Sequence, residues 1–203
     1  MAIGFPGAVR RWRFGRPIVV VSGLPRSGTS MAMKMLDAGG VEVVTDGLRT
    51  PDEDNPRGYY EDERVKDLGT TADSVWLRQA RGKAIKIISF LLKDLPSDNN
   101  YKVLFMEREL SEVLASQQKM LVNRGESSTT EDPLMRALYV EHLRHVKFLV
   151  GYRRHFDALF VDYRRALADP RSEAQRVNLF LGGHLDERAM VEVIDPELYR
   201  NRS

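Results

Sequence analysis

A short apolar run that ends in a glycine-containing loop constrains the fold more than any other part of this sequence. Residues 18–21 read Ile-Val-Val-Val without polar alternation, which is typical of a strand buried on both faces. A loop from Gly23 to Gly28 follows, and helical spacing of apolar residues begins at Ser30. A buried strand, a tight turn and a helix in this order predict the first unit of a parallel sheet.

The rest of the chain continues to alternate between strand-like and helix-like patterns. Further strands are expected at 41–45, 83–88, 101–106 and 158–161. Helices are expected at 30–38, 61–80, 90–95, 110–122, 133–155, 172–181 and 186–191. This alternation predicts an α/β fold in which helices cover both faces of a parallel sheet. The length of 203 residues suits one domain, 1–203, with a basic N-terminal tail at 1–16.

Charge is distributed unevenly along the chain. Residues 1–36 contain six basic side chains and no acidic one, whereas 46–67 contain eight acidic and four basic side chains. A basic region around the glycine loop favours an anionic ligand, and the other interpretation of 10–16 is a solvated tail. The sequence has no basic stripe interleaved with aromatic residues, so we expect no nucleic-acid partner.

The composition excludes several further classes of protein. No apolar run approaches the ~20 residues that cross a bilayer, and residues 18–21 are too short for the core of a signal peptide. The sequence contains no cysteine, which excludes a disulfide framework, a thiolate metal site and a cysteine nucleophile. We therefore expect a cytoplasmic protein without a membrane span.

The loop itself has the features of a phosphate site. Consecutive backbone N–H groups in such a turn point inward, and the following helix adds about half a positive charge at its N-terminus. The spacing is close to that of a Walker A loop, but Thr29 stands where a triphosphatase has its Lys, and Arg26 is the only cation. A bound triphosphate is therefore disfavoured, and group transfer at a single phosphate is favoured. The alternative is an ordinary strand–turn–helix corner.

The segment 25–30, Pro-Arg-Ser-Gly-Thr-Ser, resembles the 5′-phosphosulfate loop of sulfotransferases that use 3′-phosphoadenosine 5′-phosphosulfate (PAPS), especially their tyrosylprotein and bacterial branches. The resemblance implies a P-loop-type three-layer fold with a central, mostly parallel β-sheet flanked by helices. It also implies that the phosphosulfate is bound by Arg26, Ser27, Gly28, Thr29 and Ser30.

A second cluster corresponds to the 3′-phosphate that distinguishes PAPS from ATP. In the family, an Arg at the end of a strand and a Ser eight residues later bind this phosphate. Here Arg108 follows the predicted strand 101–106, and Ser116 lies eight residues further on. The resemblance therefore implies that Arg108 and Ser116 bind the 3′-phosphate. The alternative is an ordinary ion pair at Arg108 and a passive Ser116.

Transfer to a hydroxyl also needs a base, usually a His or a Glu. Residues 55–68, "NPRGYYEDERVKDL", resemble the family segment that carries the base, which implies this role for Glu61. Tyr60 departs from the family because the tyrosylprotein enzymes have Gly there. Asp62 and Glu63 are alternatives, and Glu61 is also consistent with an acid in the first turn of a helix. The histidines are further alternatives: His142, His145, His155 and His184.

Together these features predict a PAPS-dependent sulfotransferase that moves a sulfuryl group to a hydroxyl or amine acceptor by in-line transfer, without a metal. Its expected partners are the nucleotide sulfate donor and a hydroxyl-bearing acceptor. Two alternatives are a P-loop kinase or nucleotide hydrolase with a degenerate loop, and a non-catalytic nucleotide-binding protein. Residues 123–132 are expected to form a lid near the acceptor. The C-terminal Tyr199, Arg200 and Arg202 either fold back toward the nucleotide or belong to a basic tail.

Overall fold

The computed structural model describes residues 6–47, 60–70, 74–123, 125 and 133–194. Its strands are β1 (Ile18–Gly23), β2 (Ala84–Lys86), β3 (Tyr101–Glu107) and β4 (Phe156–Asp162). Its α-helices are α1 (Pro6–Phe14), α2 (Thr29–Ala38), α3 (Leu110–Asn123), α4 (Pro133–Tyr152), α5 (Tyr163–Ala168), α6 (Pro170–Leu181) and α7 (Glu187–Glu192). Three short 3-10 helices complete the list: η1 (Glu63–Asp67), η2 (Val75–Ala80) and η3 (Ser89–Asp94).

The four strands form one parallel sheet in the order β2-β1-β3-β4. Ile18 of β1 lies opposite Tyr101 of β3, which in turn lies opposite Phe156 of β4. All of β1 is buried, as the apolar run at its start predicts. Because the strands are parallel, their carboxyl ends meet at one edge, where α/β proteins usually bind ligands.

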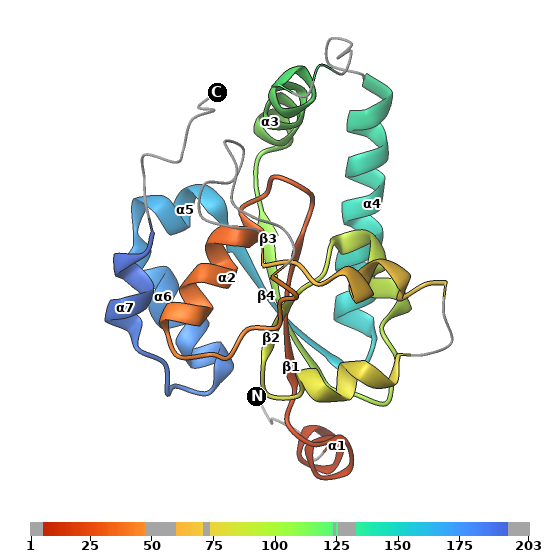
Figure 1. The fold of residues 1–203 in the computed structure, drawn as a ribbon, viewed down its shortest axis with the longest axis vertical. Coiled ribbons are helices and arrows are strands. Elements are labelled where there is room, and N and C mark those ends of the chain that lie inside the picture. Colours follow the sequence, from red (N-terminus) through yellow and green to blue (C-terminus); the bar gives the residue numbers. More distant parts are fainter. Residues whose placement is uncertain (1–5, 48–59, 71–73, 124, 126–132, 195–203) are drawn as a thin grey trace.

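Helices cover both faces of this sheet, so the predicted α/β architecture is confirmed (Figure 1). Val19 and Val21 of β1 point to the face covered by α2, α6 and α7. Ile18 and Val20 point to the opposite face, which is covered by α4 and the three 3-10 helices. This alternation follows from the two-residue period of a strand and explains why the run has no polar position.

The basic N-terminal segment contains a helix, where the sequence predicted a tail. Within α1, the Arg10 guanidinium donates hydrogen bonds to the Asn100 side chain (2.9 Å) and to the carbonyls of Ser97 (2.9 Å) and Asn99 (3.0 Å). These acceptors lie in the turn before β3. Arg10 therefore attaches α1 to the amino edge of the sheet, away from the strand ends that form the ligand edge (Figure 1).

Two predicted elements are wrong, the strand at 41–45 and the single long helix at 61–80, whereas the short helix expected at 90–95 is present as the 3-10 helix η3. Residues 41–45 make a single parallel bridge, from Val43 to Ala84, instead of a strand. The pairing stops there because the chain turns away at Thr45, whose hydroxyl donates to the Glu61 carbonyl. Residues 61–80 were predicted as one helix, but their described parts form the 3-10 helices η1 and η2. The short α5 was not predicted.

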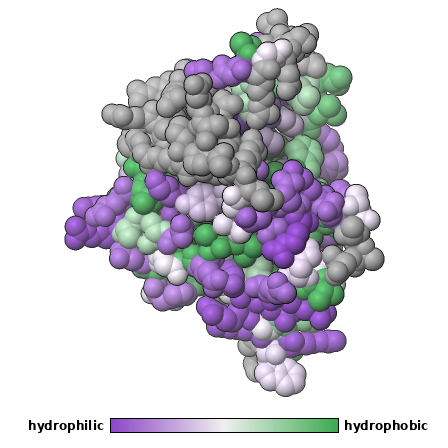
Figure 2. All heavy atoms as spheres, viewed as in Figure 1, coloured by the Kyte–Doolittle hydropathy of each residue, from purple (hydrophilic) through white to green (hydrophobic). Residues whose placement is uncertain are grey.

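Polar side chains predominate on the described part of the face shown in Figure 2, and α3 and α4 also expose apolar side chains. The exposed apolar residues of these helices include Val122, Leu134 and Leu138. None of the helices in the described ranges has both the length and the apolar character that a membrane crossing needs.

Protonation of His155 is expected to destabilise the fold in mild acid. This residue precedes β4, its buried Nε2 has no hydrogen-bond partner among the described residues, and burial lowers its pKa from 6.5 to about 4. In the unfolded chain the imidazole titrates near its ordinary pKa, so unfolding takes up a proton between the two values. The free energy of unfolding should therefore fall as the pH drops from about 6.5 toward 4.

Urea unfolding of the parent and His155→Gln at pH 7.5 and pH 5.0 measures this effect. The variant should lose less stability between the two pH values than the parent does. The matched control is His184→Gln, because His184 is exposed. Equal acid sensitivity of parent and His155→Gln contradicts the prediction.

Candidate active site

The loop between β1 and α2 makes a tight turn that depends on its glycines. Gly28, the N-cap of α2, has φ 100°, and a Cβ on it would lie 2.4 Å from Cδ2 of the Tyr163 ring. Arg26 also has positive φ, 69°, which is uncommon for a residue with a side chain. Such a conformation costs free energy and occurs often at ligand-binding sites. Gly28 has no side chain to occupy the first N–H groups of α2, so the helix N-terminus is presented to the loop.

Hydroxyl groups line this loop. Ser27 is 1% exposed, and among the described residues its Oγ has no hydrogen-bond partner. A buried hydroxyl without a partner is costly, and an anion in the loop would provide the missing acceptor. Thr29 and Ser30, the first two residues of α2, are partly exposed. These residues fit a bound phosphate group.

The structure brings the loop into direct contact with the second predicted cluster. Arg108 follows β3, and its guanidinium donates to the carbonyl oxygen of Arg26 (3.1 Å). Ser116 lies in α3, and its Oγ accepts a hydrogen bond from Nε of Arg26 (3.0 Å). Two groups of residues 82 to 90 positions apart in the sequence therefore form one cationic site at the carboxyl edge of the sheet.

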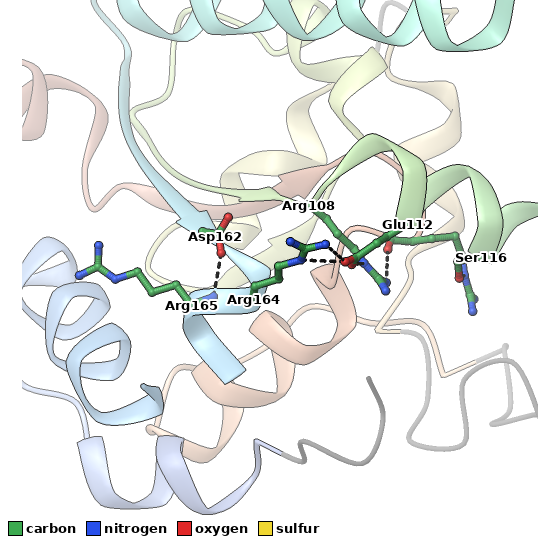
Figure 3. A network of polar contacts seen from close by, with 7 residues as sticks. Arg108, Glu112, Ser116, Asp162, Arg164 and Arg165 are labelled. Carbon is green, nitrogen blue, oxygen red and sulfur yellow. Dashed lines mark hydrogen bonds and ion pairs between the residues drawn. The ribbon is translucent and has the colours of Figure 1, made fainter. Parts of the chain in front are cut away.

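A buried carboxylate, which the sequence analysis missed, lies at the centre of this site (Figure 3). Glu112 in α3 is 1% exposed, and its two oxygens accept from Nε of Arg108 (2.8 Å) and Nε of Arg164 (2.7 Å). Arg108 thus makes the ion pair considered above, but it also contacts the loop and lies over the Tyr163 ring, 4.6 Å from its centroid. The four-residue spacing of Arg108 and Glu112 was the available signal for the pair.

Glu61, the predicted base, lies at the same edge of the sheet. Its carboxylate Oε1 is 3.0 Å from Nζ of Lys86, the last residue of β2. The Lys86 side chain is 9% exposed and that of Glu61 is 28% exposed, so the pair is partly shielded from water. Sequence analysis missed Lys86; the available signal was a basic residue inside the predicted strand 83–88.

The neighbouring acids make other contacts. Asp62 is the N-cap of η1 and accepts hydrogen bonds from the backbone N–H and the guanidinium of Arg64. The side-chain hydrogen bond from Arg64 lowers the pKa of Asp62, which makes its carboxylate a weaker base. Glu63 is exposed and pairs with Lys66. Glu61 therefore lies before η1 and is not the acid in its first turn; Asp62 caps this helix, and Glu63 is the acid in its first turn.

The histidines are dispersed. Nε2 of His142 lies 2.8 Å from the hydroxyl of Ser89, its ring stacks on Phe90, and burial lowers its pKa. His145 is exposed, and its Nε2 lies 3.4 Å from Oε1 of Glu141. Across the ranges that the structure describes, no three His, Asp or Glu side chains are grouped as metal ligands.

Several predicted functional segments lie outside the described residues. They are most of the predicted lid, most of the break before the predicted base, and the C-terminal residues. By number these are 124, 126–132, 48–59, and Tyr199, Arg200 and Arg202.

Comparison with known proteins identifies the family. A sequence model for the sulfotransferase domain matches residues 16–200, so this chain belongs to the sulfotransferase domain family. Among solved structures, it is similar to the sulfotransferase domain of the olefin synthase from Synechococcus PCC 7002. That match has a TM-score of 0.54 and 17% sequence identity, and it covers 93% of this chain and 84% of the other. No curated protein sequence matches the chain significantly.

The fold and the family agree with each other. The parallel sheet with helices on both faces is the P-loop-type α/β fold of sulfotransferases, which confirms the predicted fold class. Sulfuryl transfer is the chemistry of this family, and the predicted family resemblance is confirmed.

Proposed function

We propose that this protein transfers a sulfuryl group from PAPS to a hydroxyl or amine acceptor. In this in-line reaction the acceptor oxygen or nitrogen forms a bond to sulfur while the bond between sulfur and the 5′-phosphate oxygen breaks. The acceptor loses its proton, and the leaving group is adenosine 3′,5′-bisphosphate. The observation that carries the proposal is the contact between Arg26 and Arg108. This contact brings the two proposed anion sites next to each other. A sulfate donor with a 5′-phosphosulfate and a 3′-phosphate requires two such sites. The family match over 16–200 supports one catalytic domain.

The glycine loop would hold the 5′-phosphosulfate. Backbone N–H groups of residues 26–30 and the N-terminus of α2 supply partial positive charge. The hydroxyl of Ser27 gains a partner in the bound state, and Thr29 and Ser30 add donors. Arg26 stabilises the charge that develops on the departing phosphate. We propose that these groups suffice without a metal ion.

Arg108 and Ser116 would hold the 3′-phosphate. Arg108 provides charge-assisted hydrogen bonds, and Ser116 provides a hydroxyl donor. Both side chains are buried or nearly so: Ser116 is 4% exposed and the Arg108 side chain 7% exposed. Burial strengthens their electrostatic interaction with a phosphate.

Glu61 would accept the proton of the acceptor. Its carboxylate lies at the carboxyl edge of the sheet, and the ammonium of Lys86 orients it. Among the three consecutive acids, Asp62 is committed to Arg64 and Glu63 is exposed beside Lys66. This arrangement favours Glu61 over both neighbours as the base.

Binding of the product nucleotide tests the proposal. Adenosine 3′,5′-bisphosphate should bind more tightly than adenosine 5′-monophosphate by about 2–3 kcal/mol, the scale of a charged hydrogen-bonded group. Titration calorimetry of the purified protein with both nucleotides and with ATP measures the preference. Arg108→Ala should remove most of the preference for the bisphosphate and leave the affinity for the monophosphate little changed.

The same titrations separate the alternatives. Equal affinity for the two adenosine nucleotides contradicts the roles of Arg108 and Ser116. Magnesium-dependent turnover of ATP supports a kinase or hydrolase instead, although Thr29 replaces the Lys that those enzymes use. Tight binding of the bisphosphate without transfer to any acceptor supports a non-catalytic nucleotide-binding protein.

A further inference from the structure

Two arginines from different elements share one buried carboxylate at the proposed 3′-phosphate site (Figure 3). Arg108 follows β3 and Arg164 lies in α5, directly after β4. Between them, Glu112 accepts from Arg108 on one oxygen and from Arg164 on the other. The pair Arg108–Glu112 is almost fully enclosed, with side chains 7% and 1% exposed, whereas the Arg164 side chain is 48% exposed.

The charges of this cluster explain why a second arginine is needed. Glu112 neutralises one positive charge, so Arg108 and Glu112 together form a neutral pair that would attract a phosphate dianion weakly. Arg164 restores a net positive charge to the cluster. A phosphate bound by two guanidinium groups also gains more charge-assisted hydrogen bonds than a phosphate bound by one.

We propose that Arg164 is a further ligand of the donor's 3′-phosphate, beside Arg108 and Ser116, and that Glu112 positions both guanidinium groups. The proposal rests on the proposed function, because it assigns Arg164 to the same anion site. Nε and Nη2 of Arg164 both donate to Glu112 and remain hydrogen bonded to it, so the guanidinium, which belongs to a side chain 48% exposed, contacts the phosphate through Nη1.

The next residue along the chain provides a matched control. Arg165 is 57% exposed at its side chain and pairs with Glu173, a carboxylate buried beneath it, at 2.8 Å. Glu173 also pairs with Arg176, so it keeps one arginine when Arg165 is removed. Likewise, Glu112 keeps Arg108 when Arg164 is removed. Figure 3 shows Arg165 pointing away from Glu112.

The experiment compares the affinities of the full-length variants for adenosine 3′,5′-bisphosphate and adenosine 5′-monophosphate by titration calorimetry. Arg164→Ala should reduce the preference for the bisphosphate about tenfold, the low end for a hydrogen bond to a charged group because Arg164 is half exposed. Affinity for the monophosphate should stay unchanged. Arg165→Ala should alter neither affinity, although thermal stability should fall similarly in both variants.

Two more variants separate direct contact from an indirect effect through Glu112. Arg164→Gln keeps a hydrogen-bond donor for Glu112 but removes the charge, so it should behave like Arg164→Ala. Arg164→Lys keeps the charge and should retain part of the preference. The proposal is overturned if Arg164→Gln prefers the bisphosphate over the monophosphate as strongly as the parent does. It is also overturned if Arg164→Ala and Arg165→Ala show the same preference for the bisphosphate. If the parent itself shows no preference, the proposed function fails first.

Discussion

Arg26→Ala is expected to slow sulfuryl transfer by about 10²–10³-fold, the effect of losing one preorganised group that stabilises transition-state charge. In the structure Arg26 belongs to the glycine loop, and its guanidinium donates to the hydroxyl of Ser116, a residue proposed to bind the 3′-phosphate. Single-turnover transfer from PAPS to a model acceptor measures the change. Arg26→Lys should keep part of the rate, because the sulfotransferases that this loop resembles carry either Lys or Arg there.

The positive φ of Arg26 requires an additional control. Alanine at φ 69° is strained much as arginine is, whereas glycine adopts this conformation readily. Arg26→Gly therefore removes the charge and the strain together. If charge is what matters, the Ala and Gly variants should be equally slow although Gly is the more stable of the two. Full activity in either one places the transferred group elsewhere.

Glu61→Gln is expected to lower the transfer rate by roughly 10²–10⁴-fold while binding of adenosine 3′,5′-bisphosphate stays like that of the parent. Glutamine keeps the shape of the side chain but does not accept a proton as a carboxylate does. The base acts on the acceptor alone, so the donor site should be unaffected. Single-turnover transfer and calorimetry on the same sample measure both quantities.

The contact with Lys86 makes a stability control necessary. Glu61→Gln leaves a nearly buried ammonium without its carboxylate, so the melting temperature should fall by a few degrees. The rate is therefore expressed per folded molecule. Glu63→Gln is the matched control, since Glu63 is exposed and pairs with Lys66, and it should transfer at the parent rate. Unchanged transfer in Glu61→Gln moves the base to Asp62, Glu63 or a histidine.

Local patterns were sufficient to locate the four strands of the sheet. The runs that became β1 and β3 are apolar at nearly every position, because helices cover both faces of the sheet, and this is visible in the sequence alone. The segment 41–45 has similar composition but lies at the sheet edge beside a three-residue strand, so only one bridge forms. Whether a segment lies at the edge of the sheet depends on the assembled sheet, so it cannot be predicted from a short stretch of sequence.

Long-range contacts account for most of what was missed. The helix that contains Arg10 was not predicted, because the acceptors of Arg10 lie about ninety residues away, in the turn before β3. Arg164 was missed for a similar reason, since its partner Glu112 lies 52 residues before it. By contrast, Arg108 and Ser116 could be predicted from the resemblance, because that resemblance includes their spacing. The structure brings these residues to the glycine loop, and the roles of Arg108, Ser116, Arg26 and Glu61 remain predictions.

The adjacent arginines of α5, Arg164 and Arg165, restrict how many residues can connect β4 to α5. Arg164 is fixed to Glu112 in the cationic site, and Arg165 is fixed to Glu173 in α6, on the helical layer of one sheet face. An insertion or deletion between β4 and α5 would rotate the helix by about 100° per residue and separate both arginines from their carboxylates. The direct connection between β4 and α5 therefore has a fixed length. It couples the geometry of the cationic site to the packing of α5 against α6.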